Sequence, residues 1–260
     1  MALRPEYRAL LAVDIERSAG RGNTALHLIR DALARALRQA CARSGIEWRD
    51  ALRDDLGDGF RLTAPAGTEK ARLVHPLVPE LAAGLREHNR TAAPKARVRV
   101  RVALHAGDVF VDPAGPVTGQ PLEVLARLLD AAPARAALRR ACAFVTASLL
   151  LSSHFHEETV RHGYPGIDPE TFHRVPLAEK EYTAHAWLHL PGYAGPAPVP
   201  EDDGVERETP PVRGGARMVN RASGHGVVYA LQSGTQHIHV TREQRPHRTA
   251  LHDKTTKEPL

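Results

Sequence analysis

The sequence predicts an α+β fold in which helices layer a mixed sheet. Its patterns follow one another as strand-helix, strand-strand, helix, strand, helix, strand-helix and strand-strand. The clearest strand covers residues 97–105, where apolar residues at even positions alternate mostly with arginines at odd positions. The predicted hairpins favour an α+β sheet over a doubly wound parallel sheet, in which strands and helices alternate.

The first third of the chain predicts a strand, a helix and a hairpin. Residues 7–14 are an apolar run that ends in an aspartate, as expected of a buried strand. Apolar residues then recur at helical spacing from Leu26 to Ala40, with Asn23 or Thr24 as the cap. The glycines on either side of Asp58 predict the turn of the hairpin.

The later elements are predicted from the same two periodicities. The helix expected at residues 74–88 has Pro76 and Pro79 near its start. Proline is tolerated there, because the first turn of a helix needs no intrahelical N–H donors. In chain order we expect a helix at 74–88, helices between 122 and 140, a strand at 143–145, a helix from Thr146 toward Val160, and strands at 172–177 and 182–190.

Composition divides the chain into three parts. Residues 1–190 carry the periodic patterns and form the predicted domain. Residues 191–218 are rich in proline, glycine and acidic residues, which is typical of a flexible linker. Residues 219–260 form a tail that we expect to be disordered apart from a β-prone motif at residues 220–240.

Composition also excludes several classes of protein. The formal charge of +5 is modest, and the basic residues lack the interleaved aromatic residues of a nucleic-acid platform. The two cysteines have no metal-ligand spacing, which argues against a disulfide framework or a zinc site. The N-terminus is charged, and no run of about 18 apolar residues occurs. We therefore expect a cytoplasmic protein with no membrane or nucleic-acid partner.

Two aspartates stand at the ends of predicted strands. Asp14 ends the first strand, and Asp58 lies in the hairpin turn. Taken singly, Asp14 could cap the following loop and Asp58 could serve only the turn. Carboxylates at adjacent strand ends can together bind Mg²⁺ or Mn²⁺, because these ions take hard oxygen ligands beside substrate phosphates. The pair therefore predicts a metal site.

Three segments in order resemble the class III adenylate and guanylate cyclase domains. They are Asp14-Ile-Glu-Arg-Ser18, Leu56-Gly-Asp-Gly59 and Arg101-Val-Ala-Leu-His-Ala-Gly107, and the resemblance covers residues 7–190. It implies a ferredoxin-like sheet layered by helices. It also implies conversion of a nucleoside triphosphate to a 3′,5′-cyclic nucleotide and pyrophosphate, which is phosphorus-oxygen lyase chemistry.

The same resemblance implies roles for individual residues. Asp14 and Asp58, with the Ile15 carbonyl, would bind the metal ions. Because such sites lie between two head-to-tail copies, a homodimer is implied, and Arg127 of the second copy would stabilise the transition state. Lys180 falls where the family keeps a lysine for the triphosphate.

Three positions depart from the family pattern. Glu123 stands where the family has an asparagine, and a carboxylate opposes the electrostatic stabilisation of a triphosphate. The two base-reading positions hold Asp54 and Pro116. The chain therefore resembles a divergent, actinobacterial type of cyclase domain, and whether it is an enzyme stays open. Three interpretations remain open. The chain is a pyrimidine-specific cyclase in antiphage defence, it is a cyclase with an unusual substrate, or it has lost catalysis. The last would leave a signalling or adaptor protein that dimerises or binds nucleotide.

The tail contains a second resemblance. Residues 220–240 include Leu231-Gln-Ser-Gly234, which is similar to the core of bacterial amyloid-signalling motifs akin to the RIP homotypic interaction motif. Residues 227–240 have high β-propensity and no proline, the profile of a cross-β segment. The resemblance implies an effector or receptor partner with a matching motif. A terminal hairpin that packs on the domain, or a tail without a role, remains the alternative.

Overall fold

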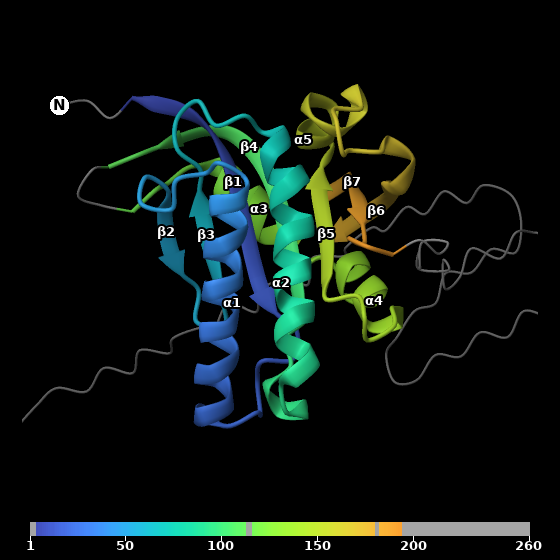
Figure 1. The fold of residues 1–260 in the computed structure, drawn as a ribbon. Coiled ribbons are helices and arrows are strands. Elements are labelled where there is room, and N and C mark those ends of the chain that lie inside the picture. The colour runs from blue at the N-terminus through green and yellow to red at the C-terminus, as the bar shows by residue number, and fades with distance from the viewer. Residues whose placement is uncertain (1–3, 113–115, 180–181, 194–260) are drawn as a thin grey trace, which may run out of the picture. The chain divides into compact units, whose positions relative to one another are not determined.

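The fold is built on one seven-stranded sheet. The computed structural model describes residues 4–112, 116–179 and 182–193. The strand order is β2-β3-β1-β4-β5-β7-β6; β4 and β5 run parallel, and every other neighbouring pair is antiparallel (Figure 1). The strands are β1 (Pro5–Ile15), β2 (Leu52–Asp55), β3 (Gly59–Thr63), β4 (Val100–Phe110), β5 (Ala147–Ser152), β6 (His173–Glu179) and β7 (Tyr182–His189).

Helices cover both faces of the sheet. The helices α1 and α2 lie side by side across one face, and α3 and α4 pack on the other (Figure 1). The helices are α1 (Asn23–Arg43), α2 (Val78–Thr91), α3 (Gln120–Asp130), α4 (Ala132–Arg140) and α5 (Ser153–Glu158), with short helical turns at Leu73–Leu77, Pro94–Ala96, Val160–His162 and Pro169–Thr171. The predicted α+β fold is confirmed. Within the described ranges, no helix is both long and apolar enough to cross a membrane.

The two cores follow from the alternation of side chains along β1. Leu11 and Val13 point toward α1 and α2, whereas Leu10 and Ala12 point toward α3. All four are at most 2% exposed, because a strand between two helical layers is buried on both faces. Asp14 belongs to the second set, so its carboxylate lies on the α3 side of the sheet.

The predicted strand at 143–145 and the helix from Thr146 are wrong. The strand is β5, and the helix after it is α5, whose cap is Ser152 rather than Thr146. All six residues of β5 are buried, since it lies between β4 and β7 under helices on both faces. A short, uniformly apolar run gives no periodicity that separates a strand from a helix.

Three boundaries also differ from the prediction. The helix expected from residue 74 begins at Val78, because Pro76 lies in the preceding irregular turn. At the start of α1, Gly22 occupies the cap position and no side chain caps the helix. The strand expected at residues 97–105 runs instead as Val100–Phe110, where both faces become buried.

The predicted linker and tail lie outside the described residues, except for residues 191–193. The boundary between a domain at 1–190 and a linker at 191–218 therefore stays a prediction. The same holds for the β-prone motif at residues 220–240.

A glycine sets the close approach of β3 to β1. Gly59 pairs with Asp14, and a Cβ atom at Gly59 would lie 2.0 Å from the Val13 carbonyl oxygen. No side chain fits there unless the two strands move apart. Gly59 therefore holds the hairpin turn, with Asp58, against the end of β1.

We expect Gly59→Ala to lower the free energy of unfolding by about 1–3 kcal/mol or more, because the added methyl group meets backbone rather than a movable side chain. Gly84→Ala is the matched control. A Cβ at Gly84 in α2 meets Ala36 at an ordinary 3.4 Å, so this change should be neutral or stabilising by up to about 1 kcal/mol. Urea denaturation measures both, and equal stabilities would contradict the steric argument.

Candidate functional site

The antiparallel register brings Asp14 and Asp58 together. Asp14 lies opposite Gly59 on β3 and opposite Arg101 on β4. The Ile15 amide donates a hydrogen bond to the Asp58 carbonyl oxygen at 3.1 Å, which ties the hairpin turn to the end of β1. The Ser18 hydroxyl donates to the Asp58 carboxylate at 2.7 Å.

Arg101 is bound to both carboxylate oxygens of Asp14. Its Nε donates to Oδ1 at 2.9 Å, and its Nη2 donates to Oδ2. Asp14 is only 6% exposed. Burial raises the pKa of its carboxyl above the usual value; Arg101 opposes this rise, and the nearby Asp58 and Asp130 carboxylates add to it. The site therefore holds more negative charge than one guanidinium neutralises.

A cavity of about 230 Å³ opens beside these groups. One side is polar, and the inner face of α3 supplies an apolar side. Its charged lining residues are Asp14, Asp58, Arg61 and Asp130, and its α3 residues include Leu122, Leu125 and Leu129. The two predicted carboxylates thus line one small cavity.

Arg127 does not face this cavity within one chain. Arg127 and Glu123 are both exposed on α3, one turn apart, whereas the leucines that line the cavity are buried. The Arg127 guanidinium lies 3.7 Å from the Glu123 carboxylate. Neither residue lines the cavity of Asp14 and Asp58.

The other predicted positions are distributed as follows. Ile15 is buried at the end of β1, with its amide bound to the hairpin turn. Asp54 forms an ion pair with Arg61 at 2.9 Å, and Pro116 is exposed. Lys180 lies outside the described residues, so its role toward a triphosphate stays a prediction.

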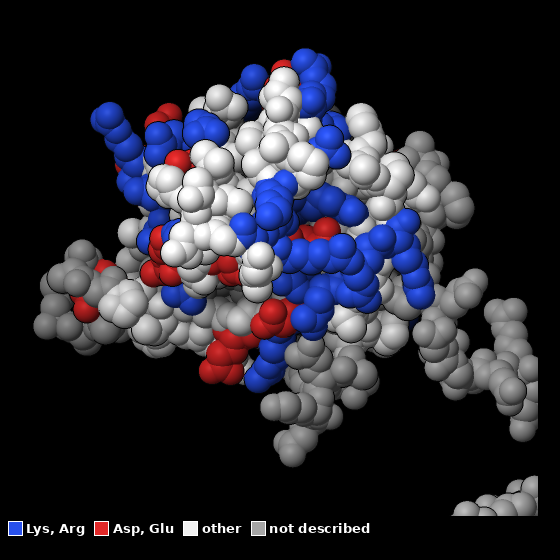
Figure 2. All heavy atoms as spheres, turned by 90° about the horizontal axis from the view of Figure 1, so that it is seen from below, with Lys and Arg blue, Asp and Glu red and all other residues white. Residues whose placement is uncertain are grey.

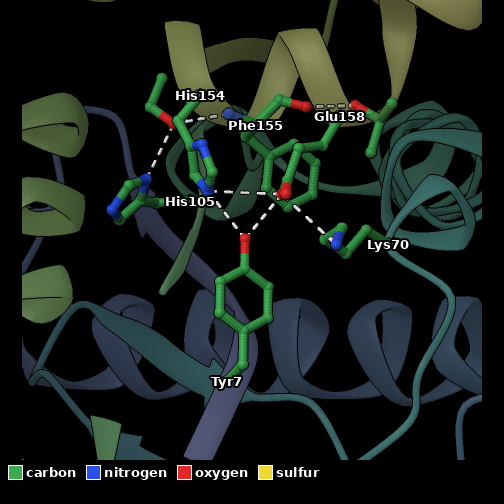
Figure 3. Close-up of polar contacts among 8 residues, drawn as sticks. Tyr7, Lys70, His105, His154, Phe155 and Glu158 are labelled. Carbon is green, nitrogen blue, oxygen red and sulfur yellow. Dashed lines mark hydrogen bonds and ion pairs between the residues drawn. The ribbon is translucent and has the colours of Figure 1, made fainter. Parts of the chain in front are cut away.

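A separate polar cluster lies at the opposite end of β1. The Tyr7 hydroxyl donates to Glu158 at 2.6 Å and lies 2.7 Å from His154 Nε2, while Lys70 pairs with Glu158 at 3.3 Å (Figure 3). Burial and the Glu158 carboxylate raise the pKa of Tyr7, so this phenol stays protonated. The contacts join β1 to α5, and we assign them a structural role.

His105 contributes to the same end of the sheet. Its Nδ1 lies 2.8 Å from the Ser152 hydroxyl, which also accepts the Phe155 amide of α5. Burial, with a smaller effect of His154, lowers the pKa of His105 to about 4. His105 is therefore neutral at physiological pH, as a buried, hydrogen-bonded histidine should be.

Arg101, Asp130 and Arg61 were not predicted as site residues from the sequence. Arg101 stands in a quoted motif, but its pairing with Asp14 depends on the register of β4 against β1. Asp130 is the last residue of α3 and reaches the cavity only because α3 packs over β1. The one local signal for Arg101 was its place among the arginines at odd positions of the predicted strand at 97–105.

Solved structures share this fold, although no protein-family model and no curated protein matches the sequence. The guanylyl cyclase Cya2 superimposes with a TM-score of 0.52 at 14% identity, over 76% of this chain and 99% of that one. An adenylate/guanylate cyclase/hydrolase from Silicibacter pomeroyi superimposes with a TM-score of 0.50 at 18% identity, over 73% of this chain and 99% of that one. The fold is that of the adenylate and guanylate cyclase domains. A bacterial light-regulated adenylyl cyclase also matches this cyclase fold, with a TM-score of 0.51 at 11% identity over 72% of this chain and 53% of that one.

We expect Arg101→Leu to destabilise the cyclase fold by about 3–5 kcal/mol at pH 7, because it leaves the buried Asp14 carboxylate without its partner. Arg43→Leu is the control, since the Arg43–Glu80 pair lies on the surface and such pairs contribute about 0–1 kcal/mol. Urea denaturation gives both values. A loss for Arg101→Leu no larger than for Arg43→Leu would contradict the importance of this ion pair.

We expect acid to destabilise the fold partly through His105. Its pKa is about 4 when folded and about 6.5 when unfolded, so the unfolded chain binds more protons between these values. The contribution of neutral His105 to the free energy of unfolding is fully present above pH 6.5 and is lost as the pH drops toward 4. From pH 7 to 5, wild type should lose about 2 kcal/mol more than His105→Gln. Urea denaturation at each pH measures this difference, and equal pH slopes for wild type and His105→Gln would contradict the prediction.

Proposed function

We propose that the chain is a divergent class III nucleotide cyclase that converts a nucleoside triphosphate to a 3′,5′-cyclic nucleotide. The 3′-hydroxyl oxygen bonds to the α-phosphorus, its proton leaves to solvent, and the bond to the β-phosphate breaks as pyrophosphate departs. The observation that carries this proposal is the shared cavity of Asp14 and Asp58 within a cyclase fold. Signalling or antiphage defence is the proposed setting.

The donor set of this cavity fits Mg²⁺ or Mn²⁺. Among the described residues, no group of three or more histidine, cysteine or acidic side chains is arranged to hold a metal ion. Two carboxylates suffice for Mg²⁺, which takes one or two of them and completes its shell with water and substrate phosphates. Asp14, Asp58 and the Ile15 carbonyl are the proposed ligands. The bound ion would polarise the reacting phosphate and lower the pKa of the hydroxyl.

The chain's own residues supply the remaining charge. Arg101 is paired with both carboxylate oxygens of Asp14, so its guanidinium offsets part of the negative charge that the triphosphate would meet. The apolar side of the cavity, formed by α3, excludes water from one flank of the site. These features position a triphosphate and strengthen electrostatic interactions around it.

We propose a homodimer as the active form. Arg127 does not line the cavity of Asp14 and Asp58 in its own copy, so in this proposal Arg127 of the second copy approaches the triphosphate. Glu123 lies beside Arg127 and weakens that contribution. Lys180, in the segment between β6 and β7, would add a further positive charge.

A second function is favoured by the partners of these same residues. Arg101 satisfies both oxygens of Asp14, Glu123 lies beside Arg127, and Asp54 pairs with Arg61. Such pairings suit a domain that has lost catalysis. In this alternative the chain is an adaptor that dimerises or binds nucleotide and recruits an effector or receptor through residues 220–240.

Incubation with each of the four nucleoside triphosphates and Mn²⁺ separates the two functions. We expect a cyclic nucleotide, identified by mass spectrometry, from at least one of them. Asp14→Ala and Asp58→Ala should each lower its rate at least about 100-fold, since even residues that only orient metal ligands cost about 10- to 100-fold. Glu123→Asn should raise the rate, because an amide removes the opposing charge.

Asp31→Ala is the matched control, because this carboxylate is exposed on α1 and pairs only with His27 among the described residues. It should retain the wild-type rate. Thermal unfolding gives a second readout: Mn²⁺ should stabilise wild type but not Asp58→Ala. No product from any nucleotide would reject the cyclase and favour the adaptor.

A further inference from the structure

A basic pocket lies between α2 and the segment that precedes β5. It encloses about 640 Å³ and shares no lining residue with the carboxylate cavity. Viewed from the end of the sheet where α2 ends and β5 begins, Lys and Arg atoms gather over the middle of the face (Figure 2). The pocket's principal residues are Arg86, Arg90, Arg97, Arg99 and Phe144.

The arginines of this pocket are incompletely neutralised. Glu87 is its one acidic lining residue among those described, and it pairs with Arg90 at 3.1 Å. Within the same part of the chain, the Arg97 side chain is exposed and has no ion pair. The pocket therefore favours an anionic ligand.

Phe144 adds an aromatic surface to this charge. Its side chain is 62% exposed, the most of any large apolar residue in the described ranges. The Arg86 guanidinium lies over its ring, 5.0 Å from the centroid. An exposed ring beside arginines is the arrangement on which nucleic-acid bases stack.

We propose that this pocket binds a single nucleotide, with the phosphate against Arg86 and Arg97 and the base on Phe144. The volume lies within the range of about 300–1,000 Å³ that is usual for small-ligand sites. A nucleic-acid strand is disfavoured, because strand-binding surfaces offer successive aromatic residues and this pocket offers one. The proposal is independent of catalysis at Asp14 and Asp58.

Isothermal titration of the full chain tests this site. The probes are AMP, GMP, CMP and UMP, with adenosine and ribose 5-phosphate as fragments; EDTA keeps divalent ions from the carboxylate cavity. We expect at least one nucleotide to bind, and each fragment to bind at least about 10-fold more weakly. Phe144→Ala and Arg97→Gln should each weaken nucleotide binding about 10-fold or more, since stacking contributes about 1–3 kcal/mol per base.

Arg35→Gln is the control, since this exposed arginine on α1 lies outside the pocket and should leave binding unchanged. Thermal unfolding verifies that each variant is folded. Three outcomes would overturn the site: no nucleotide binds, binding survives both pocket variants, or binding is lost in Asp58→Ala instead. Tight binding of a single-stranded oligonucleotide that is unaffected by Phe144→Ala would show a general polyanion surface, which also rejects the proposal.

Discussion

The register of β1 between β3 and β4 is the constraint on which the candidate site depends. It sets Asp14 opposite Gly59 on one side and Arg101 on the other. The absence of a side chain at Gly59 lets the hairpin approach, and the guanidinium of Arg101 makes burial of the Asp14 carboxylate tolerable. A shift of one residue would turn Asp14 toward α1 and separate it from Asp58.

Much of the fold could be predicted because its patterns are regular. The α1 helix, the hairpin around Asp58 and the last two strands carry clear helical or alternating periodicity, and they lie close to where the sequence places them. The central strand β5 could not be predicted, since burial on both faces makes it uniformly apolar. Its assignment requires knowing that β4 and β7 flank it, and that is information about the whole sheet.

The candidate site was predictable in its carboxylates but not in their partners. Asp14 and Asp58 follow sequence signals that are local, namely a strand end and a glycine turn. The contact with Arg101 is 87 residues distant in sequence from Asp14 and follows only from the pairing of β1 with β4. Phe144 lies in the strand that the sequence predicts at residues 143–145, and no local pattern there indicates the basic pocket. Both the Arg101–Asp14 contact and the basic pocket depend on long-range packing.

Arg99 and Arg101 are two residues apart near the start of β4 and face the same side of the sheet. Arg99 lines the basic pocket and lies 3.6 Å from Glu16. Arg101 is hydrogen-bonded to Asp14, which precedes Glu16 by two residues. Two arginines near the start of β4 therefore offset two carboxylates near the end of β1, and this charge pairing adds to the backbone ladder that holds the two strands in register.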